Sequence, residues 1–225
     1  MMKKILAATL SIGMLSMPAL GSAQDTEPAS EAAAPLPRAI NYDPAVDPEN
    51  VWLLDLSNGE RVAIRLMPAW APNHVERIKT LTRTGFYDGV IFHRVIEGFM
   101  AQGGDPTGTG QGSSAMPDLE AEFNPRPHIR GTVSMARANE ENSANSQFFI
   151  VFYPRFSLDK RYTNFGRVIA NMEGVDAITR GEPPANPTRI LQASLASDNK
   201  PQVFPQAEAP VEEEITADAL NAPLS

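Results

Sequence analysis

The sequence has no cysteine and only three histidines among its 225 residues. Without cysteine there is no disulfide framework and no thiol chemistry, a composition that is compatible with an oxidising compartment. The histidines stand far apart, and none has the spacing to a carboxylate motif that a zinc hydrolase uses. The sequence therefore predicts neither a metal site nor another cofactor, and a metal-dependent hydrolase is the least favoured enzyme class.

Positive charge is also scarce. Lys and Arg number 19 against 27 Asp and Glu, the formal net charge is −8, and the basic residues form no cluster. A surface that binds nucleic acid needs clustered Lys and Arg, so we expect no nucleic-acid partner. The glycine-rich stretch at 105–114 lacks the Gly-Lys-Ser/Thr ending of a phosphate-binding loop. We interpret it as a flexible loop that lets a peptide backbone approach.

Changes in composition divide the chain into four parts. Residues 1–23 are predicted to be a cleaved signal peptide, because two lysines precede an apolar run that ends in small residues. An uncleaved membrane anchor is the alternative, but the run is short for a span and contains glycine and proline. Residues 24–50 are predicted to be an Ala/Pro-rich linker, 51–197 a folded domain and 198–225 an acidic disordered tail. We therefore expect a periplasmic protein, or a secreted one, without stable membrane association.

Strand patterns dominate the predicted domain. Residues 51–56 and 61–66 are rich in strand formers, and the Asn58-Gly59 pair between them is a strong hairpin signal. One helix is expected to begin at Pro72 and to end near Gly85, and a second is expected near Met172. About eight strands in antiparallel order with two helices predict a mainly β domain, either a closed barrel or a sandwich.

One of these strands carries a charge inside an apolar pattern. Because side chains alternate across a strand, Phe92 and Arg94 share a face. A cation there needs a partner, so a structural ion pair with an Asp or Glu is the plain alternative to a functional role. A second strand places Gln147 beside Phe149 in the same way. Two strands that each set a polar group next to an aromatic ring predict an apolar pocket with a few converging polar groups.

These segments resemble the cyclophilin family of peptidyl-prolyl cis–trans isomerases. The resemblance covers roughly residues 51–197, with ordered blocks at near-family spacing. The blocks read FHRVI at 92–96 and GFMAQGGD at 98–105, SMA at 134–136, NSQFFI at 145–150 and NFGRV at 164–168. The family resemblance implies a closed eight-stranded antiparallel β-barrel capped by two α-helices, which selects the barrel over the sandwich.

The resemblance also implies a catalytic group. Arg94 matches the arginine that donates to the prolyl nitrogen, and Gln102 matches the residue that holds the substrate carbonyl and orients the arginine. Phe99 completes this catalytic group and also belongs to the pocket for the proline ring. The other residues that match this pocket are Met100, Phe149 and Leu158.

Further residues are implied to contact the substrate. Gln147, with Ala136 and Arg137, matches the wall that anchors the residues before proline. Tyr162 and His93 complete the substrate-binding set. His93 lies on the opposite strand face from the arginine, so we expect it to support packing rather than to transfer a proton.

The sequence departs from the best-known members of the family at three positions. The pocket tryptophan aligns with Ser157, Tyr162 stands where many members have histidine, and Arg137 stands where many have asparagine. Cyclosporin binding depends on that tryptophan, so the resemblance predicts weak inhibition. Sub-micromolar inhibition in an isomerase assay would contradict it.

The sequence therefore predicts a monomeric enzyme that accelerates rotation about X-Pro bonds in exported proteins. The mechanism expected is non-covalent stabilisation of the twisted amide. A cyclophilin-like peptide-binding chaperone or adaptor with little catalysis is the alternative. In both cases the expected partners are proline-containing, unfolded or partly folded polypeptides.

Overall fold

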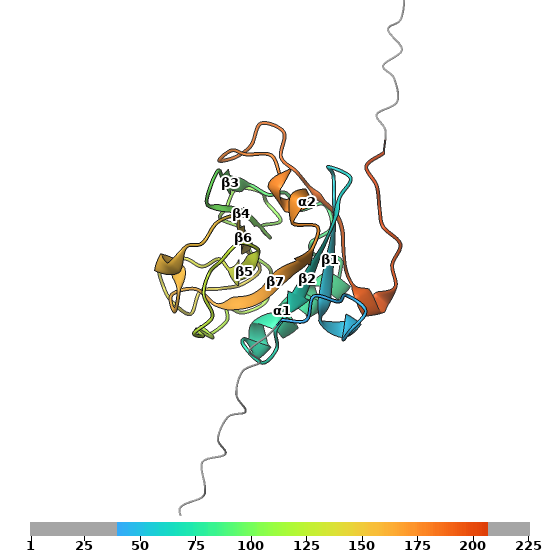
Figure 1. The fold of residues 1–225 in the computed structure, drawn as a ribbon. Coiled ribbons are helices and arrows are strands. Elements are labelled where there is room, and N and C mark those ends of the chain that lie inside the picture. The colour runs from blue at the N-terminus through green and yellow to red at the C-terminus, as the bar shows by residue number, and fades with distance from the viewer. Residues whose placement is uncertain (1–39, 207–225) are drawn as a thin grey trace, which may run out of the picture. The chain divides into compact units, whose positions relative to one another are not determined.

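The computed structural model describes residues 40–206 (Figure 1). The predicted signal peptide, most of the predicted linker and the end of the predicted acidic tail lie outside these residues. Within them, no helix is long and apolar enough to cross a membrane.

Eight strands and two α-helices form the domain. The strands are β1 (Val51–Leu56), β2 (Arg61–Leu66), β3 (Arg94–Ile96), β4 (Met100–Gly103), β5 (Thr132–Met135), β6 (Phe148–Val151), β7 (Asn164–Ala170) and β8 (Ile190–Leu195). The helices are α1 (Pro72–Arg83) and α2 (Met172–Asp176), with short 3-10 turns η1 (Pro48–Asn50), η2 (Phe156–Leu158) and η3 (Ala196–Asp198). The prediction of a mainly β domain with eight strands and two helices is confirmed.

The strands form one antiparallel sheet in the order β3-β4-β6-β5-β7-β2-β1-β8. The sheet curls, and Figure 1 shows α1 and α2 toward opposite ends of it. Two local features expected from the sequence, a hairpin turn and a helix start, are present in the structure. Gly59 turns the β1–β2 hairpin with φ +89°, and Pro72 is the first residue of α1.

The expected closed barrel is wrong in one respect, because the sheet is open. Its edge strands β3 and β8 do not pair with each other. The segments just before them touch at a single bridge between Ile91 and Arg189, where the Phe92 N–H donates to the Thr188 carbonyl at 2.9 Å. Pro187, which precedes Thr188, has no N–H with which to extend this ladder.

The main core fills the inside of the curl. Four aromatic rings at its centre are fully buried and meet mostly edge to face: Trp52, Tyr87, Phe92 and Phe148. Helix α1 covers one end of the core with Val75, Ile78 and Leu81, the stripe expected from its sequence. A second, smaller apolar cluster lies on the opposite face of β4 and β6, around Met100 and Phe149.

Chain segments outside the sheet are also fixed to it. Arg65, which is 4% exposed, donates hydrogen bonds to the main-chain carbonyls of Asn41, Asp43 and Asp47. At the other end, the N–H of Val203 donates to Asp55 Oδ2 at 2.8 Å. The described ends of the chain therefore lie along the sheet without belonging to it.

Candidate functional site

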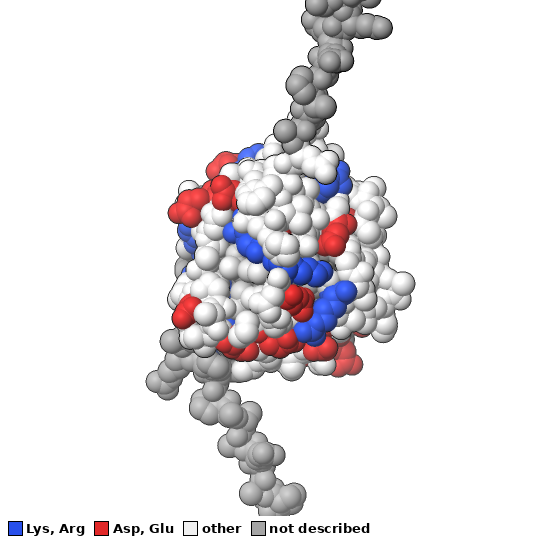
Figure 2. Space-filling view, turned by 90° about the vertical axis from the view of Figure 1, so that its right-hand side faces the viewer, with Lys and Arg blue, Asp and Glu red and all other residues white. Residues whose placement is uncertain are grey.

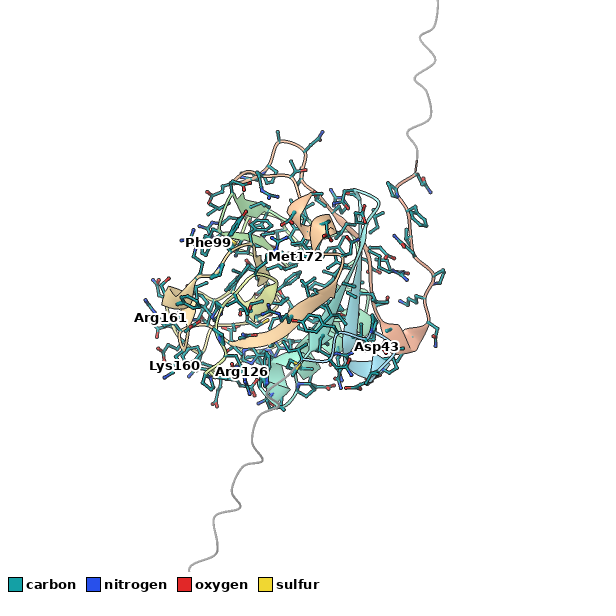
Figure 3. All side chains as sticks on the ribbon, in the orientation of Figure 1. Asp43, Phe99, Arg126, Lys160, Arg161 and Met172 are labelled. Atoms are coloured by element: carbon teal, nitrogen blue, oxygen red, sulfur yellow. The ribbon has the colours of Figure 1, made fainter. Side chains whose placement is uncertain are left out.

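A cavity of about 140 Å³ opens over the second apolar cluster. We call this cavity the slot. Its lining residues are Arg94, Phe99, Met100, Gln102, Ala136, Arg137, Phe149, Leu158 and Tyr162. All nine belong to the set singled out from the sequence. They come from strands β3, β4 and β6 and from the segments that follow β3, β5 and β6. In Figure 3, Phe99 lies on the same side of the molecule as Arg161, away from Asp43.

Strand pairing brings the polar and aromatic groups of the slot into one row. Arg94 on β3 pairs with Gln102 on β4, which pairs with Phe149 on β6. Directly opposed residues of an antiparallel pair have Cβ atoms about 4.5–5.5 Å apart on the same face. Pairing between the strands therefore places these three side chains next to one another. The expectation that Phe92 shares the face of Arg94 is wrong. Strand β3 begins only at Arg94, and Phe92 packs in the main core, with its ring centroid 6.0 Å from that of Phe148.

Aromatic and aliphatic groups form the apolar part of the slot. Phe149 is 5% exposed and Met100 is 2% exposed. The ring of Tyr162 meets Phe149 edge to face, with 5.6 Å between ring centroids. Phe99 is half-buried, and the guanidinium of Arg155 lies over its ring at 5.3 Å from the centroid. The result is a narrow apolar recess of a size suited to a small ring.

A chain of side-chain amides ends at the guanidinium of Arg94. Gln147 Nε2 donates to the carbonyls of Gly110 and Gly112, and Gln102 Nε2 donates to Gln147 Oε1 at 2.9 Å. Arg94 Nη1 in turn lies 3.5 Å from Gln102 Oε1, at the limit of a hydrogen bond. The chain connects the glycine-rich loop to the arginine through Gln147, just before β6, and Gln102 on β4.

Arg94 also has a carboxylate partner. Its Nε donates to Glu182 Oε2 at 2.8 Å, and the two side chains are 41% and 51% exposed. The ion pair expected as the plain alternative is therefore present, but it lies at the mouth of the slot, and the arginine still lines the cavity. Sequence reasoning missed Glu182, because an exposed glutamate in a Pro-rich loop carries no periodic or motif signal.

Gln147 lies outside the slot, in a second and larger cavity next to it. This cavity measures about 420 Å³ and shares Gln102, Ala136 and Arg137 with the slot. Arg137 is held at the border, where its guanidinium donates to the Arg161 carbonyl and lies 4.9 Å from the centre of the Tyr162 ring. The two cavities therefore adjoin each other, and the aromatic side chains line the slot alone.

His93 does not line the slot, in contrast to its place in the expected substrate-binding set. It is 5% exposed and points to the other face of the strand, toward Gly110. Neither of its ring nitrogens has a hydrogen-bond partner among residues 40–206. Burial lowers the pKa of His93 from its ordinary value. The ring therefore packs under the glycine-rich loop as a neutral group.

A Ser-His-Asp arrangement lies behind Phe149. His128 Nε2 is 2.9 Å from Ser134 Oγ, and its Nδ1 is 2.8 Å from Asp159 Oδ1. The spacing resembles that of a hydrolase triad, but the serine is 0% exposed and no substrate can reach it. The histidine ring stacks on Phe149, with 6.3 Å between centroids. This buried network therefore supports the slot from behind, and Asp159 ties it to η2, which carries Leu158.

No group of three or more His, Asp or Glu side chains within 40–206 could hold a metal ion. The expectation that the protein binds no metal stays a prediction. The face in Figure 2 carries both acidic and basic side chains, with several acidic ones along its lower edge.

Comparisons with known proteins agree with the geometry. The family model described as cyclophilin-type peptidyl-prolyl cis-trans isomerase matches residues 53–195. A relative from Brucella suis, a probable peptidyl-prolyl cis-trans isomerase, is 45% identical over 178 residues, which are 72% of this chain and 90% of the relative. Peptidyl-prolyl cis-trans isomerase B of Bacillus subtilis is 41% identical over 128 residues, 56% of this chain and 89% of that protein.

Solved structures show the same fold. A cyclophilin from Hirschia baltica superposes with a TM-score of 0.63 and 32% identity, covering 69% of this chain and 77% of that one. A Cryptosporidium parvum cyclophilin-type isomerase, crystallised in the presence of the dipeptide Ala-Pro, gives a TM-score of 0.60 and 28% identity, covering 64% and 98%.

Proposed function

Because this chain belongs to the cyclophilin-type peptidyl-prolyl cis–trans isomerases and is an enzyme of that class, we propose that its slot receives the proline ring and that Arg94 is the catalytic residue. The resemblance read from the sequence is thereby confirmed at the level of family and activity. The observation that carries the proposed site is the cross-strand row of Arg94, Gln102 and Phe149.

The reaction needs no bond to be broken. Rotation about a peptide bond faces a barrier of about 18–20 kcal/mol, because resonance gives the C–N bond double-bond character. At proline the cis and trans states differ by only about 0.5–1 kcal/mol, so both are populated and exchange slowly. A catalyst must therefore bind the twisted amide more tightly than either planar state.

Arg94 supplies a group that favours the twisted state. When the amide twists, the prolyl nitrogen becomes pyramidal and gains a lone pair that can accept a hydrogen bond. The Nε of Arg94 is occupied by Glu182, which leaves its Nη groups toward the slot. A guanidinium is permanently charged and rigid, so it can donate to that lone pair without reorganising.

The apolar walls and the amides hold the substrate around that donor. Phe149, Met100, Phe99 and Leu158 enclose the ring of proline, which lacks a polar edge. Gln102 holds the carbonyl oxygen next to the rotating bond, and Gln147 lies in the polar cavity where residues before proline pass. Arg137, Ala136 and Tyr162 line the passage between the two cavities.

Replacing Arg94 tests the proposal. Arg94→Ala should lower kcat/KM for a proline-containing peptide by about a hundredfold, as expected for loss of one preorganised donor. Its melting temperature should stay near that of the wild type, because the side chain is 41% exposed. Arg94→Lys is the matched control, since it keeps the charge without the planar fork and should not restore the rate.

An Arg94→Ala variant as fast as the wild type would instead favour a peptide-binding chaperone or adaptor with little catalysis. One observation supports that second candidate. Tyr153 and Phe156, near the η2 side of the slot, are 55% and 64% exposed and could hold apolar segments of an unfolded chain.

We also propose that the protein is exported to the periplasm, or secreted, and acts there as a monomer on exported polypeptides without stable membrane association. Support comes from the charged start, apolar run and small residues of 1–23. The formal net charge of −8 is in keeping with a protein partner rather than nucleic acid. Mass spectrometry of the protein from separated cell fractions tests this, since a chain retaining residues 1–23 in the membrane would contradict it.

A further inference from the structure

The loop between α2 and β8 is attached to strand β3, beside which it lies in Figure 1. Gly181 and Val95 exchange two main-chain hydrogen bonds, with N···O distances of 2.9 and 2.8 Å. Residues 180–182 therefore form a short antiparallel pair with the strand that carries Arg94. In the register of this pair, Glu182 lies directly opposite Arg94.

The shape of the loop fixes the position of Glu182 further. A Cβ on Gly181 would lie 2.5 Å from Pro184 Cα, so the loop folds back closely on itself at φ +146°. Pro184 is buried beneath this turn. An ordinary exposed ion pair contributes little, partly because two long side chains must be ordered to form it. Here the backbones are already held in register, which reduces that cost.

The contact between the two side chains has a defined direction. Glu182 accepts from Nε of Arg94, at 2.8 Å, rather than from the Nη groups. Fixing Nε sets the plane of the guanidinium, because the group is rigid and planar. The Nη edge is then turned away from the carboxylate and toward Gln102 and the slot.

We propose that Glu182 is a positioning residue for Arg94, which holds the guanidinium plane so that an Nη group faces the prolyl nitrogen of the bound substrate. The inference rests on the catalytic role proposed for Arg94. It assigns to the 180–182 loop a function in the reaction, although Glu182 itself does not touch the substrate.

The test compares two substitutions at position 182 with a matched control. Glu182→Ala should lower kcat by about fivefold with KM nearly unchanged, because an exposed ion pair contributes up to about this factor. Glu182→Gln keeps an acceptor oxygen for Nε and should retain at least about half of the wild-type kcat. Glu97→Ala should leave kcat unchanged. Glu97 pairs with Arg180 Nε at 2.7 Å, between the same two segments, without touching Arg94.

A spectroscopic readout accompanies the kinetics. In the 15N spectrum of arginine side chains, the Nε–H signal of Arg94 is identified by its loss in Arg94→Ala. It should be sharp and protected from exchange with water in the wild type and in Glu182→Gln. In Glu182→Ala it should exchange rapidly, because the donor then faces water.

Three results would overturn the inference. The first is a kcat of Glu182→Ala equal to or above that of the wild type. The others are a loss of kcat in Glu182→Gln, or in Glu97→Ala, as large as the loss in Glu182→Ala. The last would show that the loop merely needs to stay attached. Arg94→Ala in the same series separates the two proposals. If it is fully active, the catalytic role fails and this inference with it, whereas a defective Arg94→Ala beside a normal Glu182→Ala removes only this inference.

Discussion

Strand β6 carries two consecutive phenylalanines whose surroundings differ sharply. Phe148 is 0% exposed and meets Trp52 edge to face, with ring centroids 4.9 Å apart, inside the curl of the sheet. Phe149, on the opposite face, stacks on the ring of His128 and shares its row with Arg94 and Gln102. The first face packs into the main core, while the second combines an apolar surface with polar side chains and lines a cavity. The stabilising core and the proposed catalytic slot thus lie on opposite faces of the same strand.

The largest effect is expected from Phe148→Ala. Removing a fully buried ring leaves a cavity and should lower the free energy of unfolding by about 3–5 kcal/mol. Urea unfolding followed by tryptophan fluorescence measures this loss. The kcat/KM of the molecules that remain folded should change little, because Phe148 does not line the slot. A large selective loss of activity would contradict the separation of the two faces.

Phe149→Ala should show the reverse pattern. Its loss removes a wall of the slot, which should lower kcat/KM by on the order of tenfold, since burying a side chain of this kind contributes about 1.5–3 kcal/mol and only part is lost. Its effect on the free energy of unfolding should be smaller than that of Phe148→Ala, because its cluster is small and open to solvent. The same urea titration and peptide assay apply. Equal stability losses in the two variants would show that the slot belongs to the core.

The smallest effect concerns pH. Burial lowers the pKa of His74, His93 and His128 below 6.5, the ordinary value for histidine. For His74 and His128 this effect outweighs the nearby carboxylates of Glu122 and Asp159, which raise the pKa. The unfolded chain therefore binds protons that the folded chain excludes, so the free energy of unfolding should fall as pH drops below about 6.5. We expect a lower urea midpoint at pH 5.5 than at pH 7.5. A midpoint that rises on acidification would contradict the neutral state of these rings.

Local patterns in the sequence predicted most of the slot. Strand alternation and family blocks identified Arg94, Gln102 and Phe149, and strand pairing then brings them together. The hairpin at Gly59 and the start of α1 at Pro72 follow from local backbone preferences. These features depend on residues close in sequence, or on strands whose faces are fixed by a period of two.

Contacts between distant segments could not be predicted in the same way. Glu182 is 88 residues from Arg94, and Asp159 is 31 residues from His128. The expectation of a closed barrel is wrong for the same reason. Closure depends on whether the edge strands β3 and β8, which are far apart in sequence, pair beyond Pro187. Residues 119–123, which have a strand pattern, form only one bridge, between Leu119 and Ala144. Loop composition carries no signal for such partners.

The amide chain beside the slot gives each of its members a fixed polarity. Gln147 donates to two backbone carbonyls, so its oxygen must face Gln102, and the oxygen of Gln102 must in turn face Arg94. Rotating either amide by half a turn would set oxygen against oxygen or N–H against N–H. Gln102 consequently has one N–H without a partner among residues 40–206, and its oxygen keeps one lone pair besides the one directed at Arg94. In the proposed binding mode, this N–H gives the substrate carbonyl a donor whose direction is already fixed.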